Sequence, residues 1–249
     1  PAIDLGSAVI DVAPMGTETC AVLENGAVKC WGQRRFAEAL GDEPGEVGPE
    51  LRAEDLGGPA SQLSAGSRRM CVLLQNGRVT CWGDNDQGEL GLGHTDDVHW
   101  PDRNQHVDLG PGRIAIAVTQ GYRHTCALLD TRQVKCWGFN FGVLGLGDRE
   151  HRGGEPGEMG DALPTVNLGE GLLVSRLVSV STFTCALLSN DQIKCWGRFP
   201  CIWSGNSGQC IGRGGDPADM GDALPAVDLG PGRVVDLAAG RDHACALFD

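Results

Sequence analysis

A fourteen-residue block recurs four times along this 249-residue chain, and a fixed internal repeat is the feature that most restricts its fold. The copies read TCAVLENGAVKCWG from Thr19, MCVLLQNGRVTCWG from Met70, TCALLDTRQVKCWG from Thr125 and TCALLSNDQIKCWG from Thr184. A fifth copy begins as ACALFD at Ala244. A chain of this kind folds as similar units in which each buries its apolar faces against its neighbours.

Each unit reads as short β-strands separated by Gly, Pro, Asn and Asp, with three clear strands and a weaker fourth. Both faces of the cysteine-containing strands are apolar, so the sheets must be covered on both sides, as in the blades of a β-propeller. We therefore predict an all-β, partial or open propeller with four complete blades and the start of a fifth. Its single domain, 1–249, divides into approximate repeats 1–55, 56–108, 109–167, 168–228 and 229–249.

Two cysteines stand ten residues apart in every complete block. If Cys20 lies opposite Cys30, then residues 24–26 form a three-residue hairpin loop with a glycine in the left-handed position. Directly opposed cysteines are close enough for a disulfide. The predicted bridges are Cys20–Cys30, Cys71–Cys81, Cys126–Cys136 and Cys185–Cys195. Reduced, buried cysteines and a zinc site shared between two blocks remain the alternatives.

Three further cysteines fall outside these pairs. Cys201 and Cys210 lie in an insertion that begins at Arg198, and we expect them to form a fifth bridge across a surface loop. Cys245 has no partner at the usual spacing, so we expect one beyond Asp249, in missing C-terminal sequence or in another chain. The chain starts in mid-repeat at Pro1 without a Met, which suggests a mature product or a fragment.

The net charge of −13 restricts the possible partners. The three lysines, Lys29, Lys135 and Lys194, each precede a Cys-Trp-Gly, so they do not form the basic patch that a nucleic-acid backbone requires. We expect no nucleic-acid binding. We also expect no membrane insertion, because the chain has no apolar run of 18 residues.

The repeat pattern, best seen from Gly121 to Gly147 and from Ser67 to Gly93, resembles that of the regulator of chromosome condensation family. The resemblance implies a β-propeller, usually of seven blades, that serves as a binding scaffold. The family's founder is a nuclear exchange factor for a small GTPase, and another member is a secreted inhibitor of a β-lactamase. The paired cysteines resemble bacterial secreted or envelope members, which implies an extracellular, periplasmic or cell-surface location.

No motif for catalysis or for a cofactor is present: GxSxG, HExxH and the P-loop are all absent. We predict no catalytic residue, no cofactor and no metal. The turn from Asp84 to Glu89 resembles a calcium loop, but Thr95 stands where a bidentate Glu is needed, so calcium stays only an alternative. His124 and His243 share one repeat position, where we expect a structural histidine bonded to a neighbouring loop rather than a metal-binding or catalytic one.

Aromatic side chains that break the repeat are the best candidates for contacts with a partner, because aromatic residues anchor interfaces. The candidates are Trp203 and Phe199 in the insertion, Trp100, Phe139, and Tyr122 with Arg123. Phe141 could instead fill a turn. The predicted function is that of an exported, non-enzymatic scaffold that binds a protein or other macromolecule through blade-connecting loops. The alternatives are an exchange-factor-like regulator of a small GTPase and a secreted enzyme inhibitor.

Overall fold

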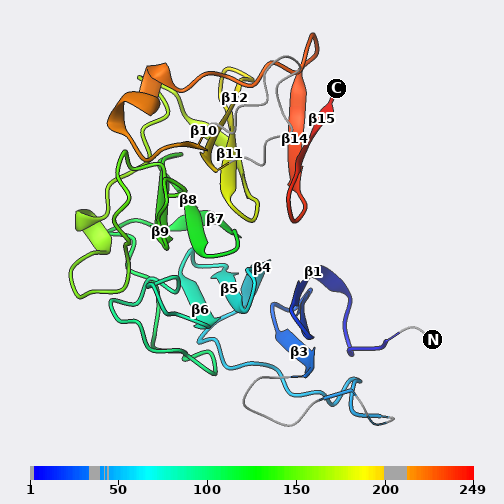
Figure 1. Ribbon diagram of the computed structural model, residues 1–249. Coiled ribbons are helices and arrows are strands. Elements are labelled where there is room, and N and C mark those ends of the chain that lie inside the picture. Colours follow the sequence, from blue (N-terminus) through cyan, green and yellow to red (C-terminus); the bar gives the residue numbers. More distant parts are fainter. Residues whose placement is uncertain (1–2, 34–39, 42, 44, 199–211) are drawn as a thin grey trace.

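The structure is a computed structural model that describes residues 3–33, 40–41, 43, 45–198 and 212–249. Its strands form five antiparallel sheets in chain order (Figure 1). The first three sheets are β1 (Val9–Met15), β2 (Glu18–Leu23) and β3 (Val28–Gly32); β4 (Ala60–Ala65), β5 (Arg69–Leu74) and β6 (Val79–Gly83); and β7 (Ala115–Gln120), β8 (His124–Leu129) and β9 (Val134–Gly138). The last two are β10 (Val174–Ser179), β11 (Phe183–Leu188), β12 (Ile193–Arg198) and β13 (Gly212–Arg213); and β14 (Val234–Ala239) and β15 (Ala244–Phe248).

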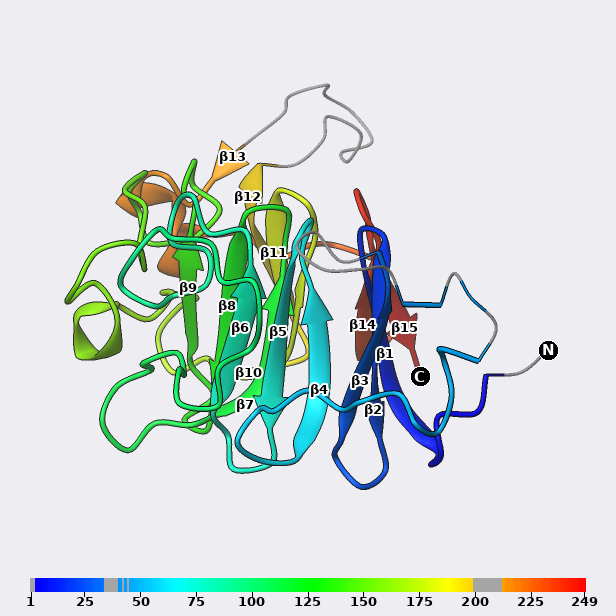
Figure 2. The ribbon, with the colours of Figure 1, turned by 90° about the horizontal axis from the view of Figure 1, so that it is seen from below.

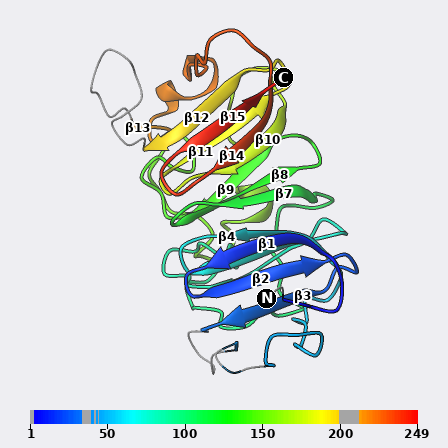
Figure 3. The same ribbon diagram turned by 90° about the vertical axis from the view of Figure 1, so that its right-hand side faces the viewer.

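The five sheets stand side by side along an arc, as the blades of a β-propeller do (Figure 1). The first strands of successive sheets lie next to one another along the inner side of this arc. Figure 3 shows the sheets β1–β3 and β14–β15 at the two ends of the arc. The helical content is limited to short 3-10 turns at Gly160–Ala162, Pro217–Asp219 and Gly221–Ala223, and among the described residues no helix is long and apolar enough to cross a membrane.

The predicted weaker fourth strand is reduced to single backbone pairs in the first three sheets. The last residue of each third strand pairs with a residue further along the chain, and these pairs are Gly32–Leu40, Gly83–Val98 and Gly138–Arg152. In the fourth sheet the equivalent Gly197 pairs with Arg213 in the two-residue strand β13. Each of the first four blades is thus a three-stranded sheet with a rudimentary fourth strand at its edge, and the fifth consists of β14 and β15.

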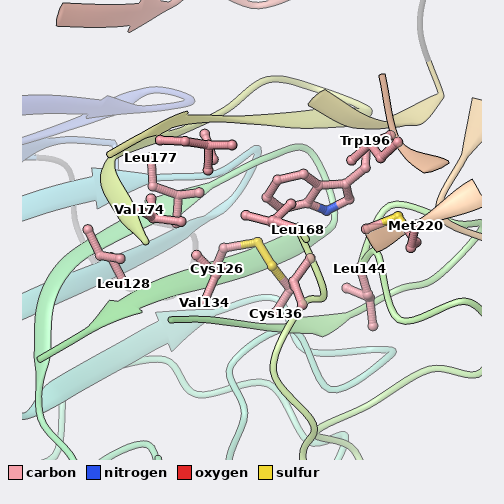
Figure 4. Packing of buried hydrophobic residues seen from close by; sticks show 14 of the residues in the cluster. Cys126, Leu128, Val134, Cys136, Leu144, Leu168, Val174, Leu177, Trp196 and Met220 are labelled. Carbon is pink, nitrogen blue, oxygen red and sulfur yellow. A yellow bond between two sulfur atoms is a disulfide. The ribbon is translucent and has the colours of Figure 1, made fainter. Parts of the chain in front are cut away.

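The hydrophobic core lies between adjacent sheets. In one such layer, the Cys126–Cys136 pair packs against Val174 and Leu177 of the next sheet, together with Trp196 (Figure 4). Every residue of β5, β8 and β11 is buried, which confirms that the middle strands are covered on both faces. The tryptophans of the Cys-Trp-Gly motifs are buried in the second to fourth sheets, but Trp31 at the end of the arc is only partly buried.

The hairpins have the predicted register. Cys20 lies opposite Cys30, and the structure joins this pair and the three equivalent pairs as disulfides. Gly26 and Gly77 have φ values of +80°, as the left-handed loop position requires. The equivalent Arg132 and Asp191 adopt the same conformation, with φ of 64° and 63°, although they carry side chains. Cys201 and Cys210, the predicted fifth pair, lie outside the described residues.

The three lysines hold consecutive segments of chain together. Lys135 Nζ donates hydrogen bonds to the backbone oxygens of Leu109, at 3.0 Å, and Gly160, at 2.7 Å. Lys29 and Lys194 each bind two backbone oxygens in the same way. Burial lowers the pKa of Lys135, and the nearby carboxylates of Asp161 and Asp108 oppose this. All three lysines are therefore structural, and none of them is a surface charge.

Candidate binding face

One side of the propeller carries the turns between the first and second strands of each sheet, together with the segments that leave each third strand. Because neighbouring strands are antiparallel, these segments meet on the same side, which we call the loop face. It is the upper side in Figure 2, where β4 and β12 point toward it. The turns on it are residues 16–17, 66–68, 121–123, 180–182 and 240–243. The three-residue hairpin loops lie on the opposite side.

Four of the six aromatic and arginine candidates lie on this face. Tyr122 and Arg123 form the turn between β7 and β8, and Phe139 directly follows β9. Trp100 follows Val98, which pairs with the end of β6. The other two candidates, Phe199 and Trp203, lie outside the described residues.

Arg123 and three aromatic rings form a cluster on the third blade. The Arg123 guanidinium carbon lies 4.9 Å from the centre of the Phe139 ring, which is within cation–π distance. Phe139 in turn meets Phe141 edge to face at 4.6 Å, and its ring lies 4.8 Å from that of His151. Phe141 is 61% exposed, so the alternative that its ring fills a turn is wrong.

Arg123 is held in place by carboxylates. Its Nε donates to Glu89 Oε1 at 2.9 Å, and Glu89 is buried. Its second contact is with Asp86, at 3.5 Å. Since these bonds already occupy the guanidinium, Arg123 serves to hold the Phe139 ring and to join the second blade to the third. The cluster's exposed apolar surface comes mainly from Phe141.

Tyr122 is 53% exposed, but its backbone is fixed from both sides. Its backbone nitrogen donates to the oxygen of Ser181 in the next turn, at 2.8 Å. Its backbone oxygen accepts a hydrogen bond of 2.8 Å from Arg69, a buried residue of the preceding blade. The exposed ring of Tyr122 therefore stands on a backbone tied to both neighbouring blades. Phe141 lies in a turn of the third repeat, in which the backbone nitrogen of Gly142 donates a hydrogen bond of 2.8 Å to the side-chain oxygen of Asn140.

Comparison with known proteins agrees with this architecture. Two models of the regulator of chromosome condensation (RCC1) repeat match the chain, one over residues 60–89 and 115–142 and the other over residues 76–128. The repeats within residues 60–142 therefore belong to the RCC1 repeat family. The chain is 28% identical to the mouse E3 ubiquitin-protein ligase HERC2 over 202 residues, which are 77% of this chain and 4% of that protein. It is 29% identical to the ultraviolet-B receptor UVR8 of Arabidopsis thaliana over 150 residues, which are 59% of this chain and 33% of UVR8.

Solved structures share this fold. Human WBSCR16 superimposes with a TM-score of 0.71 at 18% identity, over 99% of this chain and 59% of that one. Yeast RCC1 (Prp20) gives a TM-score of 0.66 at 18% identity, over 98% of this chain and 54% of that one. The chain thus spans about half of these propellers and a third or less of the curated relatives named above.

His124 of this RCC1 repeat is a structural residue. It is buried, and its Nε2 lies 2.9 Å from the hydroxyl of Thr184 in the next blade. Burial lowers its pKa to about 3, and the positive charge of Arg69 contributes. The ring folds over Gly121, where any Cβ would overlap it. The repeat therefore combines a glycine with a histidine three residues later, as at Gly240 and His243.

The turn from Asp84 to Glu89, the alternative calcium site, is held by hydrogen bonds of the Asn85 side chain. The buried Asn85 side chain donates to the oxygens of His94, at 2.7 Å, and Asp96, at 3.1 Å, and its own oxygen accepts from the Leu90 nitrogen. Asn140 does the same in the next repeat. Within the described residues the one group with metal-like spacing is Glu18, Cys20 and Cys30, and its two sulfurs form a disulfide rather than thiolate ligands.

Proposed function

We propose that this RCC1-repeat chain is a non-enzymatic scaffold that holds a protein partner against its loop face. The observation that carries the proposal is a pair of exposed rings, those of Tyr122 and Phe141. The backbone of Tyr122 is tied to both neighbouring blades, and Phe141 packs edge to face on Phe139. Exposed aromatic groups on a rigid support lose little conformational entropy on binding, so they are effective anchors. Kap60 is bound to yeast RCC1 (Prp20) in one similar structure, which gives the fold a precedent for protein partners.

We further propose that the protein works outside the reducing cytosol. Four disulfides link the middle and third strands of four consecutive blades. Disulfides persist in oxidising compartments and are rare in the cytosol. Each bridge lies in the core between blades, so reduction would loosen the same layers that position the loop face.

The test replaces Phe141 and measures capture of the partner. A photo-crosslinking residue at position 122 identifies the partner in extracts of the source cells, and titration of the purified pair gives the affinity. We expect Phe141→Ala to weaken binding at least tenfold, as for an interface hot spot, with little change in melting temperature. Leu173→Ala is the matched control, because Leu173 is 46% exposed and lies on the opposite side. Equal binding by both variants would refute the proposed face.

A further inference from the structure

A histidine accepts a backbone hydrogen bond at the base of the turn that carries Phe141. The backbone nitrogen of Asn140, the residue before Phe141, donates to His151 Nδ1 at 2.9 Å. Because a backbone N–H can only donate, this Nδ1 carries no proton, and the neutral ring has its proton on Nε2. Asn140 is buried, so its backbone nitrogen would be costly to leave without an acceptor. The conformation of the turn therefore depends on the protonation state of His151.

The second repeat builds the same turn with a carboxylate. There the backbone nitrogen of Asn85 donates to Asp97 Oδ1 at 2.9 Å. Asp97 and His151 occupy equivalent positions, because each directly follows a residue whose backbone oxygen binds the asparagine side chain. Aspartate side chains generally still accept hydrogen bonds in the pH range, from about 8 to 5, in which histidines gain a second ring proton. Of these two turns, that of the third repeat is therefore the one with an acceptor that acid removes.

His151 also supports the rings next to the turn. Its ring centre lies 4.8 Å from that of Phe139, which holds Phe141 edge to face at 4.6 Å. The guanidinium of Arg123 already lies over the Phe139 ring, at 4.9 Å. Protonation of His151 would turn Nδ1 into a donor that faces the donor of Asn140, and it would add a second positive charge beside this ring. Both changes oppose the observed position of the turn.

The charged groups on the surrounding loops form pairs of opposite sign. Arg152, the residue after His151, contacts Asp148 at 2.8 Å, and Arg123 contacts Glu89 at 2.9 Å. Other charged groups on the same loops are Asp86, Arg149 and Glu150. Since both signs are represented, the hydrogen bond from Asn140 is the contact that decides how the turn responds to acid.

We propose that His151 makes partner binding at the loop face depend on pH. While its ring is neutral, His151 holds the turn and Phe141 is presented to the partner. Once the ring is protonated, the turn is released and the affinity for the partner falls. The proposal rests on the proposed function and adds the regulation of the same site.

The first test follows the turn itself and needs no partner. Amide hydrogen exchange of the ¹⁵N-labelled protein is measured by NMR at pH 7.5 and 5.5, and each rate is divided by the intrinsic rate at that pH. We expect the protection of the Asn140 amide to fall at least tenfold at pH 5.5. The Asn85 amide, bonded to Asp97, should keep its protection, and so should the amides of β8, which report on opening of the whole propeller.

Two variants separate the hydrogen bond from other effects of acid. His151→Asp reproduces the acceptor of the second repeat, and His151→Asn provides a neutral acceptor that does not titrate. In both variants we expect the protection of Asn140 to be the same at the two pH values. The second test measures affinity for the partner captured through position 122. Binding to the wild type should weaken about tenfold from pH 7.5 to 5.5, and binding to either variant should change less than twofold.

The two proposals fail separately. Asn140 protection that does not change with pH, or that falls equally at Asn85, would overturn the switch. An affinity that is independent of pH, or that falls equally in the wild type and both variants, would also overturn it. In each case, capture at pH 7.5 that is weakened by Phe141→Ala would leave the proposed function standing. Capture insensitive to Phe141→Ala would refute the proposed binding face, and regulation of binding with it, even if Asn140 were released by acid.

Discussion

The buried His124 makes the stability of the propeller depend on pH. Its pKa is about 3 in the folded protein, because burial and Arg69 disfavour the charged ring, and about 6.5 in the unfolded chain. Between these values the unfolded chain binds more protons than the folded one, so stability rises with pH. The contribution of neutral His124 is complete above pH 6.5 and is lost as pH falls toward 3.

The size of the effect follows from the difference in pKa. One pKa unit corresponds to about 1.4 kcal/mol, so lowering the pH from 7 to 5 should reduce the free energy of unfolding by about 2 kcal/mol through His124 alone. His106 also has a lowered pKa, from burial and then Arg78, but it is far less enclosed and adds less.

Urea unfolding under non-reducing conditions at pH 5, 6 and 7 measures this, with His124→Gln as the control variant. Glutamine can still hydrogen-bond to Thr184 but does not titrate. The wild type should lose about 2 kcal/mol more than the variant between pH 7 and 5. Parallel pH profiles for the two proteins would show that His124 is not held neutral by burial, and the reasoning would be wrong.

Three other predictions concern stability and thiol state. Arg132→Gly should raise the free energy of unfolding by about 0.5 kcal/mol, because it removes a side chain from a left-handed position. Gly77→Ala should lower the free energy of unfolding, since the new Cβ would lie 2.5 Å from the Cβ of Ile114. The midpoints of urea unfolding measure both effects. Lys135→Met should cost about 2–3 kcal/mol, because two backbone oxygens lose their shared donor, and a fall in melting temperature of less than a degree would contradict this. Cys245 is the free, exposed cysteine of the described residues, and the partner expected for it lies beyond Asp249 or in another chain. Iodoacetamide should therefore label Cys245 in the folded 249-residue chain by itself, while the eight bridged cysteines react only after reduction. Mass spectrometry showing eight or more reactive thiols would argue against an exported protein.

The sequence predicted those features that depend on local spacing. A ten-residue separation with a three-residue loop leaves one direct pairing of Cys20 and Cys30, and apolar residues on both faces of the same strands require sheets on either side. The sequence could not show what Lys135 binds, because its partners are backbone oxygens about 25 residues away that have no side-chain signature.

The candidate site was predictable only in part, for a geometric reason. Phe139 and Phe141 are two residues apart in one turn, and nothing in their spacing shows which ring faces outward. The structure places Phe139 beneath Arg123 and leaves Phe141 exposed.

The roles of the basic residues connect the fold to the proposed partner. The three lysines and Arg69 donate hydrogen bonds to backbone oxygens inside the propeller. The positive charge that faces solvent therefore comes from the remaining arginines, several of which contact carboxylates. The surface is consequently more acidic than the composition alone indicates. A field of this sign attracts a basic partner from a distance and fades with added salt, whereas contact with Phe141 does not depend on salt. We therefore expect the rate of association with the partner to fall as ionic strength rises. Replacement of Phe141 should mainly raise the rate of dissociation.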